Sequence, residues 1–388
     1  MKNRIKQYLL AASMCVGLTA CSDFFEPIPG VQFGLDETFA SKQRTEEYLN
    51  NVYSYVREVT DAIHPNTYGG IFTEASLDGA NRWNKTYAEW TNGSFNSASA
   101  QASEYFSKYY QAIAKASTFI QNVDKCTEAA ASTRGKWKSE ARALRAYYYF
   151  ELLRLYGPIP LIGEDPIPLD ASLEELIKER NSVDECVNFI ATELQSAIDS
   201  GDLLQRAGKA NLGRMDVATC MALKAKLYLY WASPLFNGNT DFFNVKDCYG
   251  NQLVSQTYDE TKWAKAAAAA KDVIELAKAS GLYELYVVAP KATVLPSQRP
   301  PHNALYSDKN YPEGWADVDP LLSYKSNFDG TILGSKNPEL IFTRTRIGTG
   351  HINDWAYQST PKTLKGNNRL AVTQKQVDAY AMNDGRSI

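Results

Sequence analysis

The sequence has few of the residues from which metal centres are built. It contains only three histidines in 388 residues, and none of its six cysteines forms a C-x-x-C pair; the histidines are His64, His302 and His351. Zinc and similar ions are usually held by histidine and cysteine side chains at short, characteristic spacings. Ligands scattered in this way predict no metal site, and no segment indicates a cofactor.

Catalytic motifs are also missing. The chain has no G-x-S-x-G nucleophile elbow, no H-E-x-x-H helix and no glycine-rich phosphate loop. A glycoside hydrolase would need two carboxylates about 5 to 9.5 Å apart across the scissile bond. Glu74 and Asp78 are four residues apart, but they stand beside no recognisable catalytic motif. We therefore expect a protein without enzymatic activity.

Neither sign of charge dominates the chain. It has 41 lysines and arginines against 44 aspartates and glutamates, a formal net charge of -3. A basic excess would indicate nucleic-acid binding and an acidic block would indicate a disordered tail, so we expect neither. With 44% hydrophobic residues, the composition is typical of a globular protein large enough to bury a sizeable core.

Long hydrophobic runs are absent, and the one continuous apolar stretch lies at the N-terminus. Lys2, Arg4 and Lys6 precede an apolar segment over residues 8–18. This segment is about half of the ~20 residues that a membrane-spanning helix needs. A basic start followed by a short apolar run that ends in small residues is typical of a secretory signal peptide. We predict a signal peptide over residues 1–20 and a mature domain over residues 21–388.

The apolar run ends in Leu18-Thr19-Ala20-Cys21. This motif resembles the bacterial lipobox, in which the cysteine is diacylated and becomes the mature N-terminus. The alternative is an ordinary cleavage site beside a chance cysteine. Several acyl chains anchor a protein stably, since each buried CH₂ contributes about 0.8 kcal/mol and one chain alone binds weakly. The motif predicts that Cys21 is the lipid anchor, with palmitate among its acyl groups.

Four further cysteines lie in the mature chain: Cys126, Cys186, Cys220 and Cys248. Their spacing matches no metal-binding pattern. We interpret them as mostly buried free thiols. One disulfide between them is the alternative, because a secreted protein lies in an oxidising compartment.

Apolar residues recur at spacings of three and four in several segments, which predicts amphipathic helices. The strongest predicted helix covers 137–156, with an apolar stripe of Trp137, Ala141, Leu144, Tyr148, Leu152 and Leu155. Gly157-Pro158 should end it, because proline neither donates to the helical ladder nor permits helical geometry in the residue before it. We predict further helices at 37–59, 103–123, 183–198, 215–232 and 261–280.

The same spacing predicts which faces of the last two helices are buried. On 215–232, which Pro234 should end, the apolar face is Ala218, Met221, Ala225 and Leu229. On 261–280, which Gly281 should cap, it is Trp263, Ala267, Ala270, Ile274 and Ala277.

Two of these helices resemble each other. Residues 143–146, read ALRA, align with residues 222–225, read ALKA, and Tyr149 then falls on Tyr228 at an offset of 79 residues. Small residues at matching positions let helices approach closely, as in the helix pairs of a tetratricopeptide solenoid. We therefore predict a mainly α fold, built as a tetratricopeptide-like helix-pair scaffold.

Long insertions separate the helices, at residues 65–101, 249–259 and 283–340. Loops of this length inside a compact domain are usually functional or contain short strands. The chain also has 24 tyrosines and 7 tryptophans against 15 phenylalanines. Aromatics with a polar edge suit ligands with an apolar face and a hydroxyl rim, such as sugar rings. We expect the function to lie in these insertions.

The segment from Glu140 to Leu161, EARALRAYYYFELLRLYGPIPL, resembles the signature segment of the SusD/RagB family of outer-membrane lipoproteins. Three more segments are similar to family patterns in the expected order: residues 214–237, ending WASPLFN; residues 337–342, NPELIF; and residues 373–385, TQKQVDAYAMNDG. Together with the lipobox, they extend the resemblance over nearly the whole chain.

The resemblance implies tetratricopeptide-like helix pairs that bear a loop-rich ligand-binding region. It also implies a non-catalytic, surface-exposed outer-membrane lipoprotein that binds oligosaccharides or polysaccharides and delivers them to a TonB-dependent, SusC-like transporter. Ser22, Asp23 and Glu26 resemble the acidic signal that directs such lipoproteins to the outer face of the membrane. Family members usually continue past the position of Ile388, so we expect a chain that is C-terminally truncated relative to the family.

The first long insertion carries side chains suited to a carbohydrate. Three of them offer flat apolar faces for sugar rings: Trp83, Tyr87 and Trp90. Three others offer hydrogen-bond acceptors and donors for hydroxyls: Asp78, Asn81 and Arg82. The alternative for the tryptophans is packing against the scaffold, since large aromatics are highly buried on average. For Asp78 the alternative is a brace within the loop.

A second aromatic cluster lies in the 283–340 insertion, at Tyr306, Tyr311 and Trp315. The resemblance places ligand-contacting aromatics in this region, and packing is again the alternative. A function of a different class is a protein-interaction scaffold, since helical solenoids commonly bind peptides along a concave face. The sequence leaves open whether the cargo is a glycan or a peptide.

Overall fold

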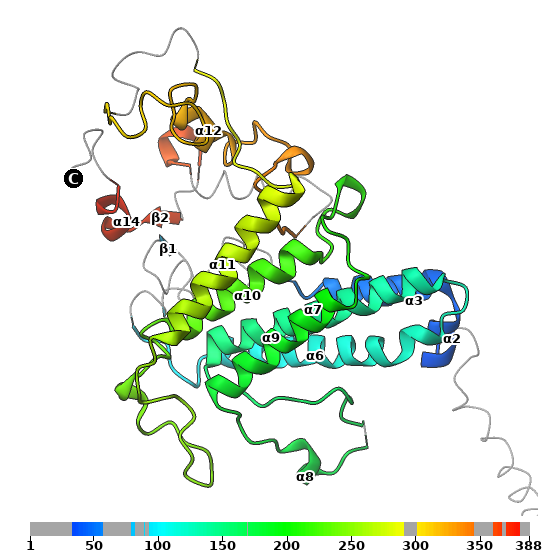
Figure 1. Ribbon diagram of the computed structural model, residues 1–388. Helices are drawn as coiled ribbons and strands as arrows, with labels where there is room; N and C mark the ends of the chain where they lie inside the picture. The colour runs from blue at the N-terminus through cyan, green and yellow to red at the C-terminus, as the bar shows by residue number, and fades with distance from the viewer. Residues whose placement is uncertain are drawn as a thin grey trace, which may run out of the picture.

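The structure, a computed structural model, describes residues 33–56, 79–81, 89, 93–168, 170–290, 301–344, 360–366 and 370–380. Within these ranges the chain is mainly helical, as predicted, and the strands are β1 (Gly79–Asn81) and β2 (Leu370–Val372). The long helices lie side by side, and the loop-rich segments that carry the short helix α12 lie to one side of them (Figure 1). No helix in the described ranges has the length and apolar character of a membrane span.

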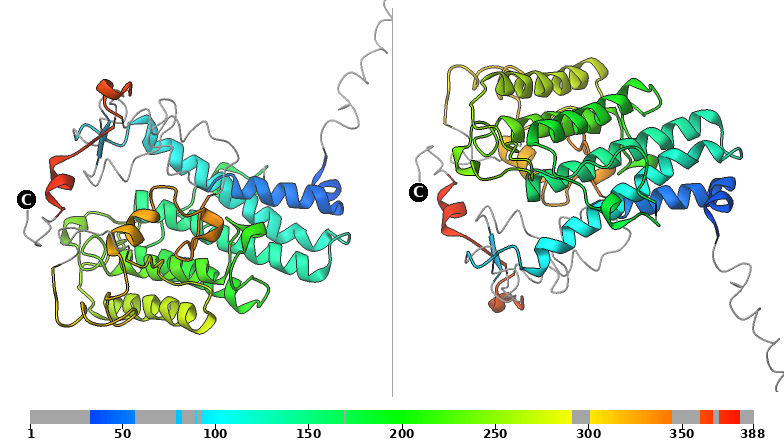
Figure 2. Two further views of the ribbon diagram at one scale, coloured as in Figure 1. Left: turned by 90° about the horizontal axis from the view of Figure 1, so that it is seen from above. Right: turned by 90° about the horizontal axis from the view of Figure 1, so that it is seen from below.

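Seven helices build the scaffold: α2 (Leu35–Ala40), α3 (Lys42–Tyr53), α6 (Ala100–Asn122), α7 (Ala131–Tyr156), α9 (Val183–Asp199), α10 (Val217–Ala232) and α11 (Thr261–Ser280). From α6 onward, each of the long helices packs against the next one along the chain. This sequential packing produces a layered array of helices (Figure 2). The predicted tetratricopeptide-like scaffold is therefore confirmed.

Shorter helical turns lie between and after these helices. They are η4 (Val123–Lys125), α8 (Leu173–Leu176), η5 (Lys209–Asn211), η6 (Thr240–Phe242), α12 (Pro320–Ser326), η8 (Gly334–Lys336), η9 (Lys362–Leu364) and α14 (Gln374–Asp378). Two of them, α12 and η8, lie inside the 283–340 insertion. The described part of that insertion therefore has local helical structure of its own.

The predicted helix ends agree with the structure to within a few residues, with two exceptions. Helix α7 begins at Ala131, six residues before the predicted start. The segment predicted as one helix over 37–59 forms α2 and α3, because the backbone of Ser41 is extended between them. Gly281 caps α11 in the left-handed conformation, with φ of 61°, as predicted from the preference of glycine for this position.

Helix α7 lies at the centre of the core and is buried on nearly all sides. The predicted stripe is buried from Trp137 to Leu152. Other faces are buried too, because α6 and α9 both pack against this helix. Tyr148, for example, is fully buried and donates a hydrogen bond from its hydroxyl to the backbone oxygen of Val52, at 2.5 Å.

The predicted buried face of α11 is wrong. Trp263 and Ile274 are exposed, with exposed fractions of 39% and 52%, whereas Ala266 and Ala269 are buried. Alanines occur all round this helix, so the spacing of apolar residues fits more than one face. The structure places the small side chains where α11 packs against α10, since they allow close approach.

The predicted face of α10 is correct in part. Ala218 is buried, Met221 and Ala225 are half-buried, and Leu229 is exposed. The hydrophobic character of α10 is spread round the helix, because α9 and α11 pack against different sides of it. Periodicity alone therefore does not identify one buried stripe.

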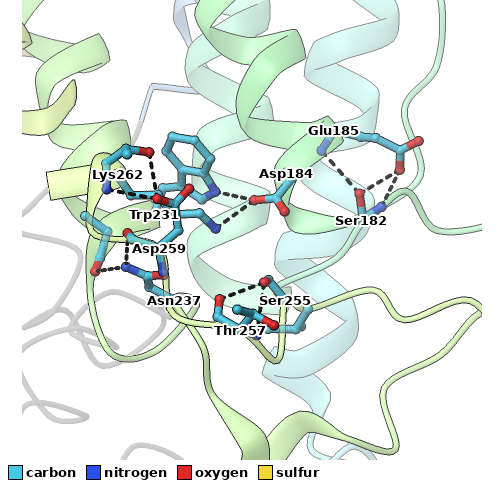
Figure 3. A network of polar contacts seen from close by, with 12 residues as sticks. Ser182, Asp184, Glu185, Trp231, Asn237, Ser255, Thr257, Asp259 and Lys262 are labelled. Atoms are coloured by element: carbon cyan, nitrogen blue, oxygen red, sulfur yellow. Dashed lines mark hydrogen bonds and ion pairs between the residues drawn. The ribbon is translucent and has the colours of Figure 1, made fainter. Parts of the chain in front are cut away.

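A polar network ties α9, α10 and α11 together (Figure 3). Asp184 near the start of α9 accepts hydrogen bonds from the indole N–H of Trp231 and from Lys262 Nζ, the latter at 2.9 Å. The ammonium of Lys262 is 4.5 Å from the centroid of the Trp231 ring. Lys262 is buried, and both interactions compensate the removal of its charge from water.

The cysteine prediction is confirmed for three of four residues. Cys126, Cys186 and Cys220 are buried free thiols, whereas Cys248 is free and exposed. Burial raises the pKa of Cys186 to about 11, so this thiol stays protonated at neutral pH. The described residues contain no group of histidine, cysteine or acidic side chains that could hold a metal ion.

Candidate functional site

Most of the predicted binding residues of the first insertion lie outside the described residues: Asp78, Arg82, Trp83, Tyr87 and Trp90. Asn81 is described as the last residue of β1, and it pairs with Leu370 in the antiparallel β1–β2 ladder. The first insertion therefore contains a short strand, and this strand joins it to a segment almost 300 residues later in the chain.

The second predicted cluster borders a cavity of about 340 Å³, which we call the aromatic cleft. Its lining includes Tyr286, Tyr311, Trp315, Tyr324, Asn327 and Glu339. Pockets that bind small ligands usually measure about 300 to 1,000 Å³ and combine apolar walls with a few polar groups. The aromatic cleft has both properties.

One wall of the cleft is a compact loop that a glycine closes. The backbone N–H of Trp315 bonds to the oxygen of Tyr306 at 2.9 Å, and that of Ala316 bonds to the oxygen of Lys309 at 2.8 Å. A Cβ atom on Gly314 would lie 2.1 Å from the oxygen of Tyr306. Only glycine permits this approach, and it places Tyr311 and Trp315 on the same wall.

Trp315 is fixed by its polar edge and by a neighbouring ring. Its indole N–H donates to Ser307 Oγ at 3.1 Å. The ring of Tyr306 packs against it, with centroids 6.1 Å apart. Tyr306 does not line the cleft. The structure therefore brings Tyr311 and Trp315 to the cavity and gives Tyr306 a supporting position.

Helix α12 and the segment 285–287 contribute further residues to the lining. Asp319 caps α12 by accepting the N–H of Leu322, and its own N–H bonds to the oxygen of Val288 at 2.7 Å. Ser323 Oγ accepts the N–H of Val288 at 2.9 Å. These bonds hold α12 against the segment around Val288. Tyr324 of α12 is exposed at the cleft, with an exposed fraction of 67%.

Glu339 is a charged residue in the lining of the cleft. Its Oε1 atom accepts the backbone N–H of Tyr286 at 2.8 Å and the side-chain amide of Asn327 at 3.1 Å. The carboxylate is therefore held by two donors on one oxygen, a backbone N–H and a side-chain amide. Exposed aromatic faces beside a fixed hydrogen-bonding group are the arrangement that sugar rings require.

Both ends of the 283–340 insertion are attached to the scaffold at one place. The guanidinium of Arg206 donates to the backbone oxygen of Leu282 and, at 3.1 Å, to that of Asn337. Tyr283 donates its hydroxyl to Asp216 Oδ2 at 3.2 Å. Burial, and after it the Asp216 carboxylate, raise the pKa of Tyr283, so the hydroxyl remains a donor. These contacts form what we call the Arg206 clamp.

Sequence reasoning missed several residues of the cleft: Tyr286, Tyr324, Asn327 and Glu339. A signal was present for one of them, since Glu339 lies in the NPELIF segment that resembles a family pattern. The others are scattered along a long insertion. Their convergence depends on how the loop folds back, which spacing does not reveal.

Two further cavities lie on the scaffold. One, about 450 Å³, we call the α6 groove; it is mainly apolar and its lining includes Phe106, Tyr110, Ile113, Ile162, Leu176 and Ile177. The other, about 260 Å³, is lined by polar residues that include Tyr53 and Arg214. Arg214 is paired with Glu46 and Glu140, each at 3.1 Å, so this second cavity is part of the structural ion-pair network.

Comparison with known proteins gives concordant results. A SusD-like family model, described as starch-binding and associating with the outer membrane, matches residues 32–229, about half of the chain. A SusD-like protein of Bacteroides ovatus is 29% identical over 158 residues, which cover 39% of this chain and 27% of that protein.

Two solved structures are similar over a larger part of this chain. BT4246 is 30% identical with a TM-score of 0.57, and the match covers 64% of this chain and 42% of that structure. A SusD-like protein of Bacteroides fragilis, BF3747, has the same fold at 18% identity, with a TM-score of 0.61 over 92% of this chain and 56% of that structure. The matches therefore span about half or less of each relative.

Proposed function

This chain belongs to the SusD-like family, and from that premise we propose that it binds oligosaccharides or polysaccharides at the cell surface without cleaving them. The observation that carries the proposal is the aromatic cleft. Tyr311, Trp315 and Tyr324 line it together with Glu339, whose carboxylate is fixed by hydrogen bonds. Ring faces stack on the C–H face of a sugar, and the polar group accepts its hydroxyls.

A binding experiment tests this proposal. The wild-type protein would first be screened on a glycan array, and the affinity for the best ligand measured by calorimetry. Tyr311→Ala and Tyr324→Ala should each lower the affinity roughly two- to tenfold, since an aromatic contact contributes about 0.5 to 1.5 kcal/mol beyond its area. Their rings are exposed, so thermal stability should change little.

Tyr249→Ala is the matched control. This tyrosine is the most exposed of the described large hydrophobic side chains, at 80%, and does not line the cleft. Its removal should leave the affinity unchanged. Full affinity in a Tyr311→Ala/Tyr324→Ala double variant would show that the ligand binds elsewhere.

The first insertion remains part of the proposed site. If Trp83 and Trp90 stack on sugar rings, their replacement by alanine should weaken binding and leave unfolding unchanged. If they are packing residues, each replacement should cost about 3 to 5 kcal/mol of stability. Calorimetry and thermal unfolding of Trp83→Ala, Trp90→Ala and the double variant separate the two roles. Unchanged affinity and stability would remove both tryptophans from the site.

We further propose that the protein delivers its glycan to a TonB-dependent, SusC-like transporter. The α6 groove supports a protein contact on the scaffold, because Leu173, Leu176 and Ile177 beside it are exposed apolar side chains. Contiguous apolar surface of this kind often marks a protein interface. Leu176→Asp/Ile177→Asp should reduce co-purification of the transporter from native membranes and leave glycan affinity unchanged.

Binding of an apolar peptide at the α6 groove, with no glycan bound by the protein, would favour the alternative of a peptide-binding scaffold. A glycan array and a peptide library screened in parallel distinguish the two. In the co-purification experiment, equal recovery of the transporter with the wild-type protein and with Leu176→Asp/Ile177→Asp would remove the α6 groove from the proposed interface.

The proposed location is the outer face of the outer membrane, with Cys21 as the lipid anchor. The support is the lipobox-like motif Leu18-Thr19-Ala20-Cys21 and the family description. Cys21→Ala should abolish acylation and release the protein from membranes, because no other acyl attachment is expected. Metabolic labelling with an alkyne fatty acid checks this, and label retained in the variant would contradict the anchor assignment.

A further inference from the structure

The charge of the side chains that line the aromatic cleft affects which class of sugar, neutral or acidic, can bind there. Among the described lining residues, Glu339 alone is charged. The described lysines of the same insertion do not offset it: Lys325 pairs with Asp329 at 3.7 Å, and Lys309 and Lys336 are exposed residues outside the lining. The described cleft therefore presents one negative charge and no positive charge.

Glu339 has one oxygen occupied and one available. Oε1 already accepts two hydrogen bonds, from Tyr286 and Asn327. In the described part of the chain, no group donates to Oε2. An ionised carboxylate only accepts hydrogen bonds, and Glu339 is exposed, so this oxygen can accept a hydrogen bond from a donor on the ligand. A sugar hydroxyl is such a donor, and hydrogen bonds to an ionised acceptor are stronger than those between neutral groups.

The donors of Asn327 and Ser323, which line the cleft with Glu339, are already engaged within the protein. The Asn327 amide already donates to Glu339 and, at 3.3 Å, to the backbone oxygen of Ser323. The Ser323 hydroxyl donates to the backbone oxygen of Asp319 at 2.6 Å and accepts the N–H of Val288. A carboxylate or sulfate on the ligand would therefore meet a like charge, and the described lining holds no cation to offset it.

We propose that the aromatic cleft selects neutral oligosaccharides against those that carry carboxylate or sulfate groups on the bound rings, and that Glu339 determines this preference. The inference rests on the proposed function, since it requires that the cleft binds glycans. Like charges a few ångströms apart repel even in water. An acidic counterpart should therefore bind roughly tenfold more weakly, a difference of about 1.4 kcal/mol.

The test uses matched pairs of glycans. An array would carry neutral oligosaccharides, malto-oligosaccharides among them, and the same molecules with their C6 hydroxyls oxidised to carboxylates. Calorimetry on the best neutral ligand and its oxidised form gives a discrimination ratio, which should be roughly ten for the wild-type protein. The ratio should fall at high salt, because salt screens interactions between exposed charges.

Glu339→Gln isolates the charge. Glutamine keeps a carbonyl oxygen for the N–H of Tyr286 and the Asn327 amide, and replaces Oε2 by a neutral NH₂ group. The variant should therefore fold as before, and its ratio should approach one. Glu284→Gln is the control, since Glu284 is an exposed acid near one end of the insertion that does not line the cleft. Its ratio should equal that of the wild-type protein.

The outcomes separate this inference from the proposed function. No binding to any glycan on the array would overturn the proposed function and the inference with it. Binding of oxidised glycans as tightly as neutral ones would overturn the inference alone. A wild-type preference for neutral glycans that persists in Glu339→Gln would remove Glu339 as its determinant.

Discussion

Arg145 is the largest fully buried side chain among the described residues, and it carries a permanent charge. Its Nε atom donates to Glu193 Oε2 at 2.9 Å, and a second nitrogen donates to Ser117 Oγ at 3.1 Å. Glu193 also accepts a hydrogen bond from Arg142 at 3.0 Å. A buried charge is tolerated only where it is paired and hydrogen-bonded, and the pair joins α7 to α9 at the centre of the scaffold.

Arg145→Ala should lower the free energy of unfolding by about 3 to 5 kcal/mol. The physical reason is that removal of Arg145 takes both of its donors from the buried Glu193 Oε2, leaves that carboxylate with Arg142 as its charged partner, and opens space in the core. Urea denaturation followed by circular dichroism measures the change. Arg142→Ala is the comparison, because Arg142 is less buried than Arg145 and its loss leaves Glu193 paired with Arg145. Equal effects of the two substitutions would contradict this account of Arg145.

The internal sequence repeat places a second basic residue at the position that corresponds to Arg145. Arg145 aligns with Lys224, and Lys224 Nζ donates to Gln195 Oε1 at 2.8 Å. Gln195 and Glu193 both belong to α9, which packs against both α7 and α10. The two equivalent basic residues therefore contact the same helix. Alignment of the sequence with itself found the equivalence, but it did not show that one member is buried with an acid and the other is not.

At the scale of helices, the same capping box begins two helices that differ in how much they contribute to the buried core. Ser182 caps α9, and Ser172 caps the four-residue helix α8; in each case a glutamate three residues later bonds back to the serine. The backbone N–H and hydroxyl of Ser182 lower the pKa of Glu185. Helix α9 contributes buried residues to the core, whereas α8 contributes none.

Ser182→Ala should therefore destabilise the protein by about 1 kcal/mol, the usual cost of losing an N-cap. Ser172→Ala should have a much smaller effect on global unfolding, because α8 can fray without exposing the core. Chemical denaturation of both variants provides the measurement. A larger loss from Ser172→Ala would mean that α8 is required for the stability of the scaffold.

The aligned alanines of the repeat give a second prediction for helices. Ala146 is fully buried on α7, whereas Ala225 on α10 is half-buried. Ala146→Trp should overpack the core and cost about 1 to 3 kcal/mol or more, and Ala225→Trp should cost less because its side chain can turn towards solvent. Thermal unfolding measures both. A reversed order would show that α10, and not α7, is the more tightly enclosed helix.

The helices were predictable from sequence where strong signals agree. The stripe of α7 and its end at Gly157-Pro158 follow from spacing and from the chemistry of proline. The prediction of the buried face was wrong where one residue type occurs all round a helix, as alanine does on α11, because the spacing of apolar residues then fits several orientations of the helix. The cleft was predictable only in part. Tyr311 and Trp315 stood out as aromatics in an insertion, but Tyr286 and Glu339, 53 residues apart, meet through a hydrogen bond that no local pattern encodes.

At the scale of the whole molecule, the Arg206 clamp connects the helical scaffold to the aromatic cleft. Leu282 and Asn337 mark the two ends of the insertion, and Arg206 bonds to the backbone of both. Its guanidinium also lies 4.4 Å from the centroid of the Tyr283 ring. Beyond the clamp, Phe342 packs against Tyr147 of α7, with centroids 6.3 Å apart. The walls of the cleft thus take their position from a few contacts at its base.

Arg206→Ala should weaken glycan binding while the scaffold keeps its stability. The variant loses the donors that hold both ends of the insertion. Ligand binding then has to order the walls of the cleft, and this entropic cost makes the free energy of binding less favourable. The buried hydrophobic core does not include Arg206, so the main unfolding transition should shift little. Calorimetry with the glycan chosen from the array measures the affinity, and limited proteolysis should show faster cleavage within residues 283–340. Arg180→Ala serves as the control, because Arg180 is exposed and makes none of these contacts. Unchanged affinity and unchanged proteolysis in Arg206→Ala would mean that the cleft holds its own shape without the scaffold.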